Sequence, residues 1–122
     1  MTDAAFVNEP PGLLRVLPVA RRLGLGRGGA LTVVALEIWE DGLVLSYVEA
    51  PPLDESLERT IPPRWAIEDD VGTSYLPGPG GSRGDARQRR GTVSFRPRPP
   101  DRAGVLRITP PSALAGRIEI PL

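Results

Sequence analysis

Apolar residues occur in short runs along the chain, and each run is bounded by glycine, proline or acidic residues. The longest run, residues 31–39, is rich in β-branched and aromatic residues and ends in Glu40-Asp41-Gly42, after which residues 43–48 resume the pattern. β-branched and aromatic side chains favour extended backbone. Asp-Gly between two such runs is a strong hairpin signal, because both residues tolerate the positive φ of a tight primed turn. We therefore predict a β-hairpin whose turn contains Asp41 and Gly42.

Later segments alternate polar and apolar residues with a period of two, which is the pattern of strands that place one face on a core. This alternation occurs in residues 92–96, 105–109 and 117–120. Residues 64–68 and 73–76 flank an acidic turn in the same way, and residues 14–17 form an expected first strand. Short strands separated by turn residues predict an all-β fold, an immunoglobulin-like sandwich of seven to eight antiparallel strands.

Residues 30–40 are long enough for a helix, but Thr, Val, Ile and Trp favour a strand there. Prolines lie at strand ends or between strands, where the missing N–H breaks no ladder. The expected core consists of apolar residues at alternating strand positions: Val34, Leu36, Ile38, Leu45, Tyr47, Trp65, Ile67, Val93, Phe95, Leu106, Ile108, Ile118 and Ile120.

The length of 122 residues suits one domain with one core. We divide the chain into an N-terminal extension, residues 1–12, and a single β-sandwich domain, residues 13–122. Residues 51–63 form an acidic connection in which residues 54–59 are expected to make a helical turn. Residues 77–91 contain Ala86 as their sole apolar residue, so we expect a flexible loop that adds nothing to the core.

The chain has no histidine, no cysteine and no lysine. It therefore lacks a side chain that titrates near neutrality, a thiolate and a Schiff-base amine, and any catalysis would rest on carboxylates, hydroxyls and arginine. We predict a protein that is not an enzyme and that uses no cofactor and no metal. The chain holds no signal-peptide pattern and no run of eighteen apolar residues, so we expect a cytoplasmic protein without a membrane span.

The formal net charge is zero, but the charges are unevenly distributed. Residues 28–57 hold six acids and no arginine, whereas residues 83–107 hold eight arginines and two aspartates. These segments can attract each other within one molecule or across a homodimer, or they can bind separate partners.

An arginine cluster in the expected loop is the main candidate binding site. It comprises Arg83, Arg87, Arg89 and Arg90. Guanidinium groups bind carboxylate and phosphate groups in a bidentate manner, so the cluster suits an acidic protein surface or another anion. Nucleic acid is the less favoured partner, because the loop has no aromatic residue for base stacking and the net charge is zero.

Three further motifs have structural explanations that we prefer. Residues 24–29 match G-x-G-x-x-G, but a dinucleotide site needs a helix after the glycines, and the residues that follow indicate a strand. Arg83-Gly84-Asp85 is an integrin-type tripeptide that chance explains in an Arg- and Gly-rich chain. Glu68, Asp69 and Asp70 are a possible acid/base group, but Asp at the start of a turn usually caps its own backbone.

The passage Trp65-Ala-Ile-Glu-Asp-Asp-Val-Gly-Thr-Ser-Tyr75 carries a resemblance to a known family. It resembles the strand, Asp-Asp-x-Gly-Thr-x-Tyr turn and strand of immunoglobulin-like β-sandwich domains in uncharacterised bacterial, especially actinobacterial, proteins. The flanking Asp-Gly hairpin, the Val-Ser-Phe strand and the closing Ile-Glu-Ile-Pro-Leu122 are also similar, so the resemblance covers residues 13–122. It implies a fold and no activity. It also implies structural turn roles for Asp69, Asp70, Gly72, Thr73 and Tyr75.

Elimination of the other function classes leaves a non-catalytic interaction or structural module. We expect it to bind another protein, or a second copy of itself, through sheet edges and the arginine loop, because edge strands offer unpaired backbone groups. The alternatives are an anion- or nucleic-acid-binding protein that uses the arginine loop and, less favoured, a carboxylate-based hydrolase.

Overall fold

The structure is a computed structural model that describes residues 11–26, 29–50, 65–85, 87–111 and 116–122. These residues form strands and turns and contain no helix, so the predicted all-β class is confirmed and the strand alternative for residues 30–40 is correct. The described ranges contain nine strands, where seven to eight were expected. Among the described residues, no helix has the length and apolar character needed to cross a membrane.

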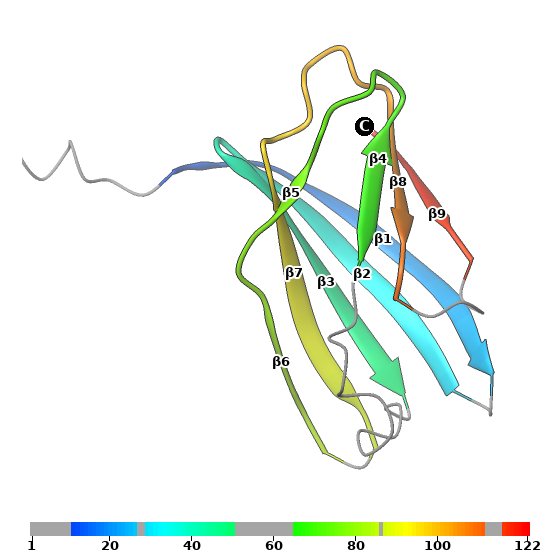
Figure 1. Cartoon of the computed structure of the whole chain (residues 1–122). Coiled ribbons are helices and arrows are strands. Elements are labelled where there is room, and N and C mark those ends of the chain that lie inside the picture. Colours follow the sequence, from blue (N-terminus) through cyan, green and yellow to red (C-terminus); the bar gives the residue numbers. More distant parts are fainter. Residues whose placement is uncertain (1–10, 27–28, 51–64, 86, 112–115) are drawn as a thin grey trace, which may run out of the picture.

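The strands form two antiparallel sheets (Figure 1). The large sheet contains β1 (Leu13–Gly26), β2 (Gly29–Trp39), β3 (Gly42–Ala50), β5 (Leu76–Pro77), β6 (Gly81–Gly84) and β7 (Arg89–Arg96). Its order is β1-β2-β3-β7-β5, and β6 also pairs with β7. The small sheet contains β4 (Ala66–Asp69), β8 (Val105–Thr109) and β9 (Ile118–Pro121), in the order β4-β8-β9.

The two sheets share one core. Its buried residues come from β2, β3 and β7 in the large sheet and from β8 and β9 in the small sheet, so the sheets pack face to face. The buried members are Val33, Leu36, Ile38, Leu43, Leu45, Phe95, Leu106, Ile108, Ile118 and Ile120. Of the other expected core residues, Trp65, Ile67 and Val93 are half-buried against this cluster. Tyr47 packs with Trp65 around the buried Leu31.

A β-bulge in β2 corrects one expected core residue. The pairing of β2 with β3 shifts between Val33 and Ala35, so Val34 has no direct partner on β3. An extra residue in one strand reverses which face the following side chains occupy. Val34 is consequently 40% exposed, and Val33, which the sequence pattern assigns to the opposite face, is fully buried. The prediction of Val34 as a core residue is wrong.

Residues 77–91 are not the flexible loop that their composition suggested. They include the end of β5, all of β6 and the start of β7. Every residue of β6 is exposed, and the strand is held by its pairing with β7. An edge strand needs a backbone partner and not an apolar side chain, which is why composition failed here. The expected strand at residues 73–76 is also reduced to Leu76, the first residue of β5.

The first strand and the turn at Gly42 differ in detail from the sequence expectation. β1 extends well past the expected residues 14–17 and contains Pro18 and, at Ala20, a φ of 51°. Gly42 is not in a left-handed conformation; it opens β3, where a side chain would meet the carbonyl oxygen of Phe95. Gly42 is thus required by close packing against β7, and not by turn geometry.

Several expectations lie outside the described residues. These are residues 1–10 of the N-terminal extension and the acidic connection 51–63 with its helical turn.

Candidate functional site

The outer face of the large sheet points away from the small sheet. Direct partners on antiparallel strands share one face, so the register arranges side chains in rows across the strands. One row runs across β1, β2, β3, β7 and β6 and contains Arg22, Thr32, Val48, Arg90 and Arg83. This row, called the arginine row below, places cations at both of its ends.

The next two rows on the same face are almost uncharged. The first contains Pro18, Ala35, Ser46, Thr92 and Gly81, and the second contains Val16, Glu37, Val44 and Ser94. The carboxylate of Glu37 accepts a hydrogen bond from the indole Nε1–H of Trp39 at 3.1 Å. The centre of this face is therefore apolar or weakly polar, with Val16 and Val34 among its exposed side chains.

The structure separates the four predicted arginines. Arg83 and Arg90 are direct partners across β6 and β7 and share the outer face. Arg89 is paired in register with Glu49 on the opposite face, and Arg87 lies in the turn between β6 and β7. The predicted site is thus reduced to a pair, Arg83 and Arg90, with Arg87 near the hairpin tip.

No acid neutralises the arginine row among the residues that the structure describes. Asp85 is close to Arg83 along the chain, but its carboxylate accepts the backbone N–H groups of Arg87 at 2.7 Å and Gln88 at 3.2 Å. These hydrogen bonds hold the pKa of Asp85 below its usual range. Asp85 therefore serves the hairpin turn, and Arg83 has no counterion among the residues that the structure describes.

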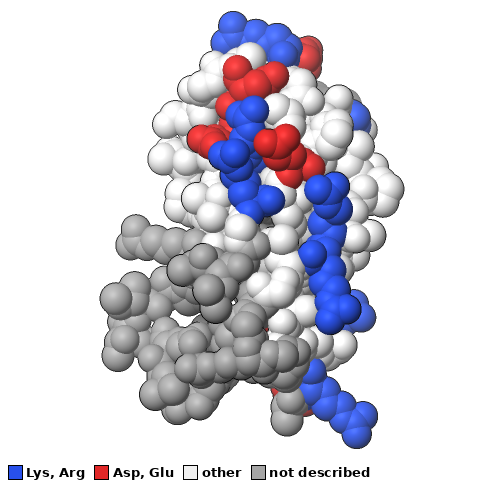
Figure 2. All heavy atoms as spheres, turned by 90° about the vertical axis from the view of Figure 1, so that its right-hand side faces the viewer, with Lys and Arg blue, Asp and Glu red and all other residues white. Residues whose placement is uncertain are grey.

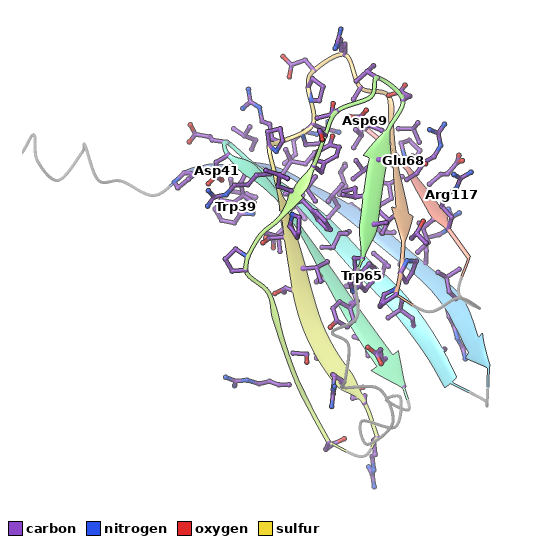
Figure 3. The ribbon with its side chains drawn as sticks, in the orientation of Figure 1. Trp39, Asp41, Trp65, Glu68, Asp69 and Arg117 are labelled. Atoms are coloured by element: carbon purple, nitrogen blue, oxygen red, sulfur yellow. The ribbon has the colours of Figure 1, made fainter. Side chains whose placement is uncertain are left out.

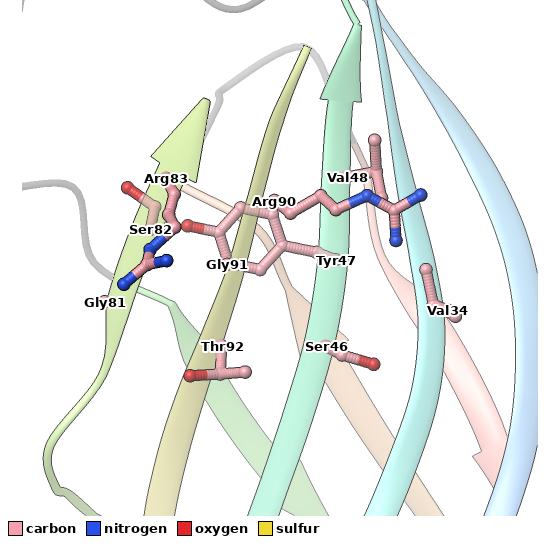
Figure 4. Close-up of a pocket in the computed structure, with 10 residues that line it drawn as sticks. All are labelled: Val34, Ser46, Tyr47, Val48, Gly81, Ser82, Arg83, Arg90, Gly91 and Thr92. Atoms are coloured by element: carbon pink, nitrogen blue, oxygen red, sulfur yellow. The ribbon is translucent and has the colours of Figure 1, made fainter. Parts of the chain in front are cut away.

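A shallow depression of about 590 Å³ lies on this part of the face (Figure 4). Arg83 and Arg90 border it, and Gly81, on the same face as Arg83, adds no side chain to fill it. The other lining residues are Val34, Ser46, Tyr47, Val48, Ser82 and Thr92. The depression thus combines two guanidinium groups with hydroxyl groups and a partly apolar wall.

The outer face of the small sheet has a different character. Glu68, Arg107 and Glu119 are direct partners across β4, β8 and β9. Arg107 pairs with Glu119 at 3.4 Å, and Arg117 pairs with Glu68 at 3.3 Å. Figure 2 shows acidic and basic side chains interleaved on this side of the molecule. This face neutralises its own charges.

The acidic turn after β4 is organised around Asp69, which is buried (Figure 3). Its carboxylate accepts the N–H groups of Val71 at 2.9 Å and Thr73 at 3.1 Å, and the hydroxyl of Tyr75 at 2.7 Å. Burial by itself would raise the pKa of Asp69, but the hydrogen bonds from Thr73, Tyr75 and Val71 outweigh it and hold the pKa well below the usual range. Gly72 supplies the positive φ of 80° that the turn needs.

The three clustered carboxylates point to different partners. Glu68 pairs with Arg117 on the outer face, Asp69 faces its own turn, and Asp70 accepts the N–H of Gly104 at 3.0 Å. No group of three or more acidic, His or Cys residues with metal-ligand geometry occurs in the described part of the chain. Each of these carboxylates is engaged in a contact within the fold.

The two remaining motifs lie in hairpins. Gly24 and Gly26 belong to β1 and Gly29 opens β2, with Gly26 paired to Gly29, so the described glycines of the motif lie at the paired ends of two antiparallel strands and precede a strand. Arg83 and Gly84 end β6, and Asp85 begins the turn to β7.

Sequence reasoning missed Arg22 and Thr92 as members of the candidate face. The strand predicted at residues 14–17 ends before Arg22, and the strand predicted at residues 92–96 includes Thr92 without assigning it to a site. The signal was available for Thr92, because strict alternation from the buried Phe95 places it on the outer face. Arg22 depends on the register of β1 with β2, which irregularities shift between Pro18 and Arg21.

Comparisons with known proteins give no relative for this arrangement. No protein-family model matches the chain, and neither the curated proteins nor the solved structures contain a match.

Proposed function

We propose that the chain is a non-catalytic binding module that holds another protein on the outer face of the large sheet. The observation that carries this proposal is the contrast between the two outer faces. The small sheet pairs Arg107 with Glu119 and Arg117 with Glu68. The large sheet presents exposed Val16 and Val34 beside an arginine row that has no acid partner among the described residues.

An apolar centre with a charged margin is the usual composition of a protein-binding surface. Desolvation of valine and alanine side chains would supply affinity, and the arginine row would select a partner with an acidic segment. The edge position of Arg83 also places its guanidinium where a partner can reach it.

We place the contact on the face because both edges of the large sheet carry features that hinder strand addition. β1 contains Pro18, the left-handed Ala20 and register shifts along its length. The other edge is interrupted between β5 and β6 by Gly78, Pro79 and Gly80. Proline, bulges and short strands are the means by which proteins prevent edge-to-edge pairing.

We also propose that the two sheets form an immunoglobulin-like sandwich. The shared core supports this arrangement, as does the path of the chain, which crosses from β3 to β4 and from β7 to β8, while β3 pairs with β7 and β4 pairs with β8. In such sandwiches, functional contacts are commonly made by one sheet face or by the loops.

The test compares outer-face variants of the two sheets. Tagged chains that carry Val16→Glu, Val34→Glu or the control Ala66→Glu are isolated from the organism of origin after cross-linking. Ala66 is exposed on β4 and matches the valines in apolar character. A protein recovered with the native chain and with Ala66→Glu, but lost with both valine variants, supports the proposal.

Equal recovery with all three variants removes the outer face as the contact. Sedimentation of the purified native chain distinguishes the remaining outcome, in which the recovered partner is a second copy of the chain. A valine variant that dissociates such a dimer, while Ala66→Glu does not, places the self-contact on the same face.

A further inference from the structure

Arg83 and Arg90 face each other on adjacent strands with no acid between them. They are direct partners across β6 and β7, and like charges in this position destabilise a sheet. Figure 4 shows their side chains extending in different directions, that of Arg83 along β6 and that of Arg90 across β3 toward Val34. This divergence is the arrangement expected of two cations that repel each other.

Three other arginines of the fold, Arg96, Arg107 and Arg117, lie close to carboxylates. On β7 itself, Arg96 lies 4.0 Å from a carboxylate oxygen of Asp41. On the small sheet, Arg107 and Arg117 each have a glutamate within 3.4 Å. Arg83 and Arg90 therefore differ from these arginines by lacking a protein counterion in the described part of the chain, and not by their exposure alone.

The residues around this pair leave room for a small anion. Gly81 precedes Arg83 by two positions on the same face, and Thr92 follows Arg90 by two, so small residues border the pair. The Thr92 hydroxyl has no partner within the described chain. The absence of a side chain on Gly81 leaves room in the depression of about 590 Å³.

We infer that this depression is a binding site for one tetrahedral oxyanion, the phosphate or sulfate group of a monoester, toward which the guanidinium groups of Arg83 and Arg90 would turn from the diverging positions of Figure 4. Each guanidinium offers parallel N–H donors that match two oxygens of such a group. The anion would replace the repulsion between the arginines with two attractions, and the Thr92 hydroxyl would supply a further donor.

A single group is favoured over a nucleic-acid strand. Strand binding uses a continuous basic groove and aromatic side chains on which bases stack. The row continues from Arg90 to Val48 and Thr32, which are uncharged, and the depression is lined by one aromatic residue, Tyr47. Tyr47 packs against Trp65 in the space between the sheets and offers no exposed stacking platform.

This anion-binding site goes beyond the proposed function, because it would bind a free anion whether or not the face binds a protein. The experiment follows backbone amide resonances of the ¹⁵N-labelled chain during titration at constant ionic strength. The probes are inorganic phosphate, phenyl phosphate and N-acetyl-phosphoserine amide, with acetate and chloride as comparison anions. We expect saturable shifts at residues 81–83 and 90–92 with the phosphate probes and none with acetate or chloride.

Variants then test the assignment to these arginines. Arg83→Gln with Arg90→Gln should weaken phosphate binding about tenfold or more, because both charge-assisted contacts to the anion are lost. Arg96→Gln is the matched control on the same strand and should leave binding unchanged. The circular dichroism spectrum of each variant verifies folding, and Arg83→Lys with Arg90→Lys replaces the double Gln variant if that variant is unfolded.

The two phosphate esters distinguish the sources of the group. Tighter binding of N-acetyl-phosphoserine amide than of inorganic phosphate identifies a phosphorylated protein side chain as the ligand of the anion-binding site. Equal binding identifies free phosphate as the ligand. Shifts that acetate produces equally, or that Arg96→Gln abolishes as strongly as the double variant, overturn the inference. Loss of protein binding in the valine variants with phosphate binding intact would separate the two proposals.

Discussion

The hydroxyl of Tyr75 donates a hydrogen bond to the carboxylate of Asp69 at 2.7 Å and thereby closes the turn that follows β4. The turn leads from the small sheet to β5 of the large sheet, so this contact fixes one of the crossings between the layers. Asp70 reinforces the same region by accepting the N–H of Gly104, which lies before β8. Both carboxylates therefore tie together segments that are distant in the sequence or belong to different layers.

Removal of the Tyr75 hydroxyl should lower the stability of the fold. In Tyr75→Phe, the Asp69 carboxylate loses a donor while remaining buried, and hydrogen bonds to a charged group contribute about 1.5–3 kcal/mol. We expect the free energy of unfolding, measured by urea titration, to decrease by about 1.5–3 kcal/mol. Ser74→Ala, at an exposed position of the same turn, is the control and should change it by less than about 0.5 kcal/mol. Equal effects of the two substitutions would contradict this role.

Asp69 should also make the stability depend on pH in the acidic range. Its pKa in the folded chain lies below the ordinary value because Thr73, Tyr75 and Val71 donate to it despite burial. The unfolded chain then binds the proton more readily, so the contribution of Asp69 is complete above about pH 5 and declines as the pH falls through about 4 and below. The unfolding temperature, measured between pH 2 and pH 7, should therefore fall steeply toward the acidic end of this range.

Asp69→Asn tests whether Asp69 causes this loss of stability at acidic pH. The variant should be less stable than the native chain at pH 7, and its stability should decline less between pH 5 and pH 2, because the titrating group is gone. Asp101→Asn, at an exposed position, should keep the native slope. A native-like slope in Asp69→Asn would assign the acid sensitivity to other carboxylates.

The sequence pattern identified the strands that have a buried face. Residues 92–96, 105–109 and 117–120 alternate polar and apolar residues, and they lie within or overlap β7, β8 and β9. Their alternation survives in the structure because each has one face on the shared core, as Phe95, Leu106 and Ile118 show. The hairpin between β2 and β3 was found for the same reason, although Gly42 serves packing against Phe95 and not a left-handed turn.

The candidate face could not be derived in the same way. The grouping of Arg83 with Arg90 depends on β6, a strand without a single buried residue, whose only sequence feature is a polar, glycine-containing composition. The grouping of Arg22 with these residues needs the register across five strands, including shifts in β1 that local propensity does not encode. Registers of exposed edge strands are set by backbone pairing, which leaves little trace in residue type.

A methyl group at position 91 should disturb the packing of Tyr47 on β3. A side chain on Gly91 would overlap the phenol ring and hydroxyl of Tyr47. Tyr47 would have to move from its contact with Trp65, where the ring centroids are 5.1 Å apart. We expect Gly91→Ala to cost about 1–3 kcal/mol of stability and to change the fluorescence of Trp65.

The control for Gly91→Ala is Gly81→Ala on the neighbouring strand, where an added methyl group meets open space. It should leave stability and fluorescence close to native. Combining Gly91→Ala with Tyr47→Val should cost less than the sum of the two single substitutions, because the small side chain relieves the overlap. Strict additivity would show that the two positions do not interact.

The bulge in β2 gives a prediction that distinguishes the structure from the simple strand pattern. Val33 is fully buried and Val34 is 40% exposed, whereas uninterrupted alternation through Leu36 and Ile38 places Val34 in the core. Valine and threonine have nearly the same shape, so replacement by threonine changes polarity with little change in volume. Val33→Thr buries a hydroxyl among apolar side chains and should cost about 1–3 kcal/mol, and Val34→Thr should cost less than about 0.5 kcal/mol. Urea unfolding of both variants measures the difference, and the reverse order of the two costs would place Val34 inside and remove the bulge from β2.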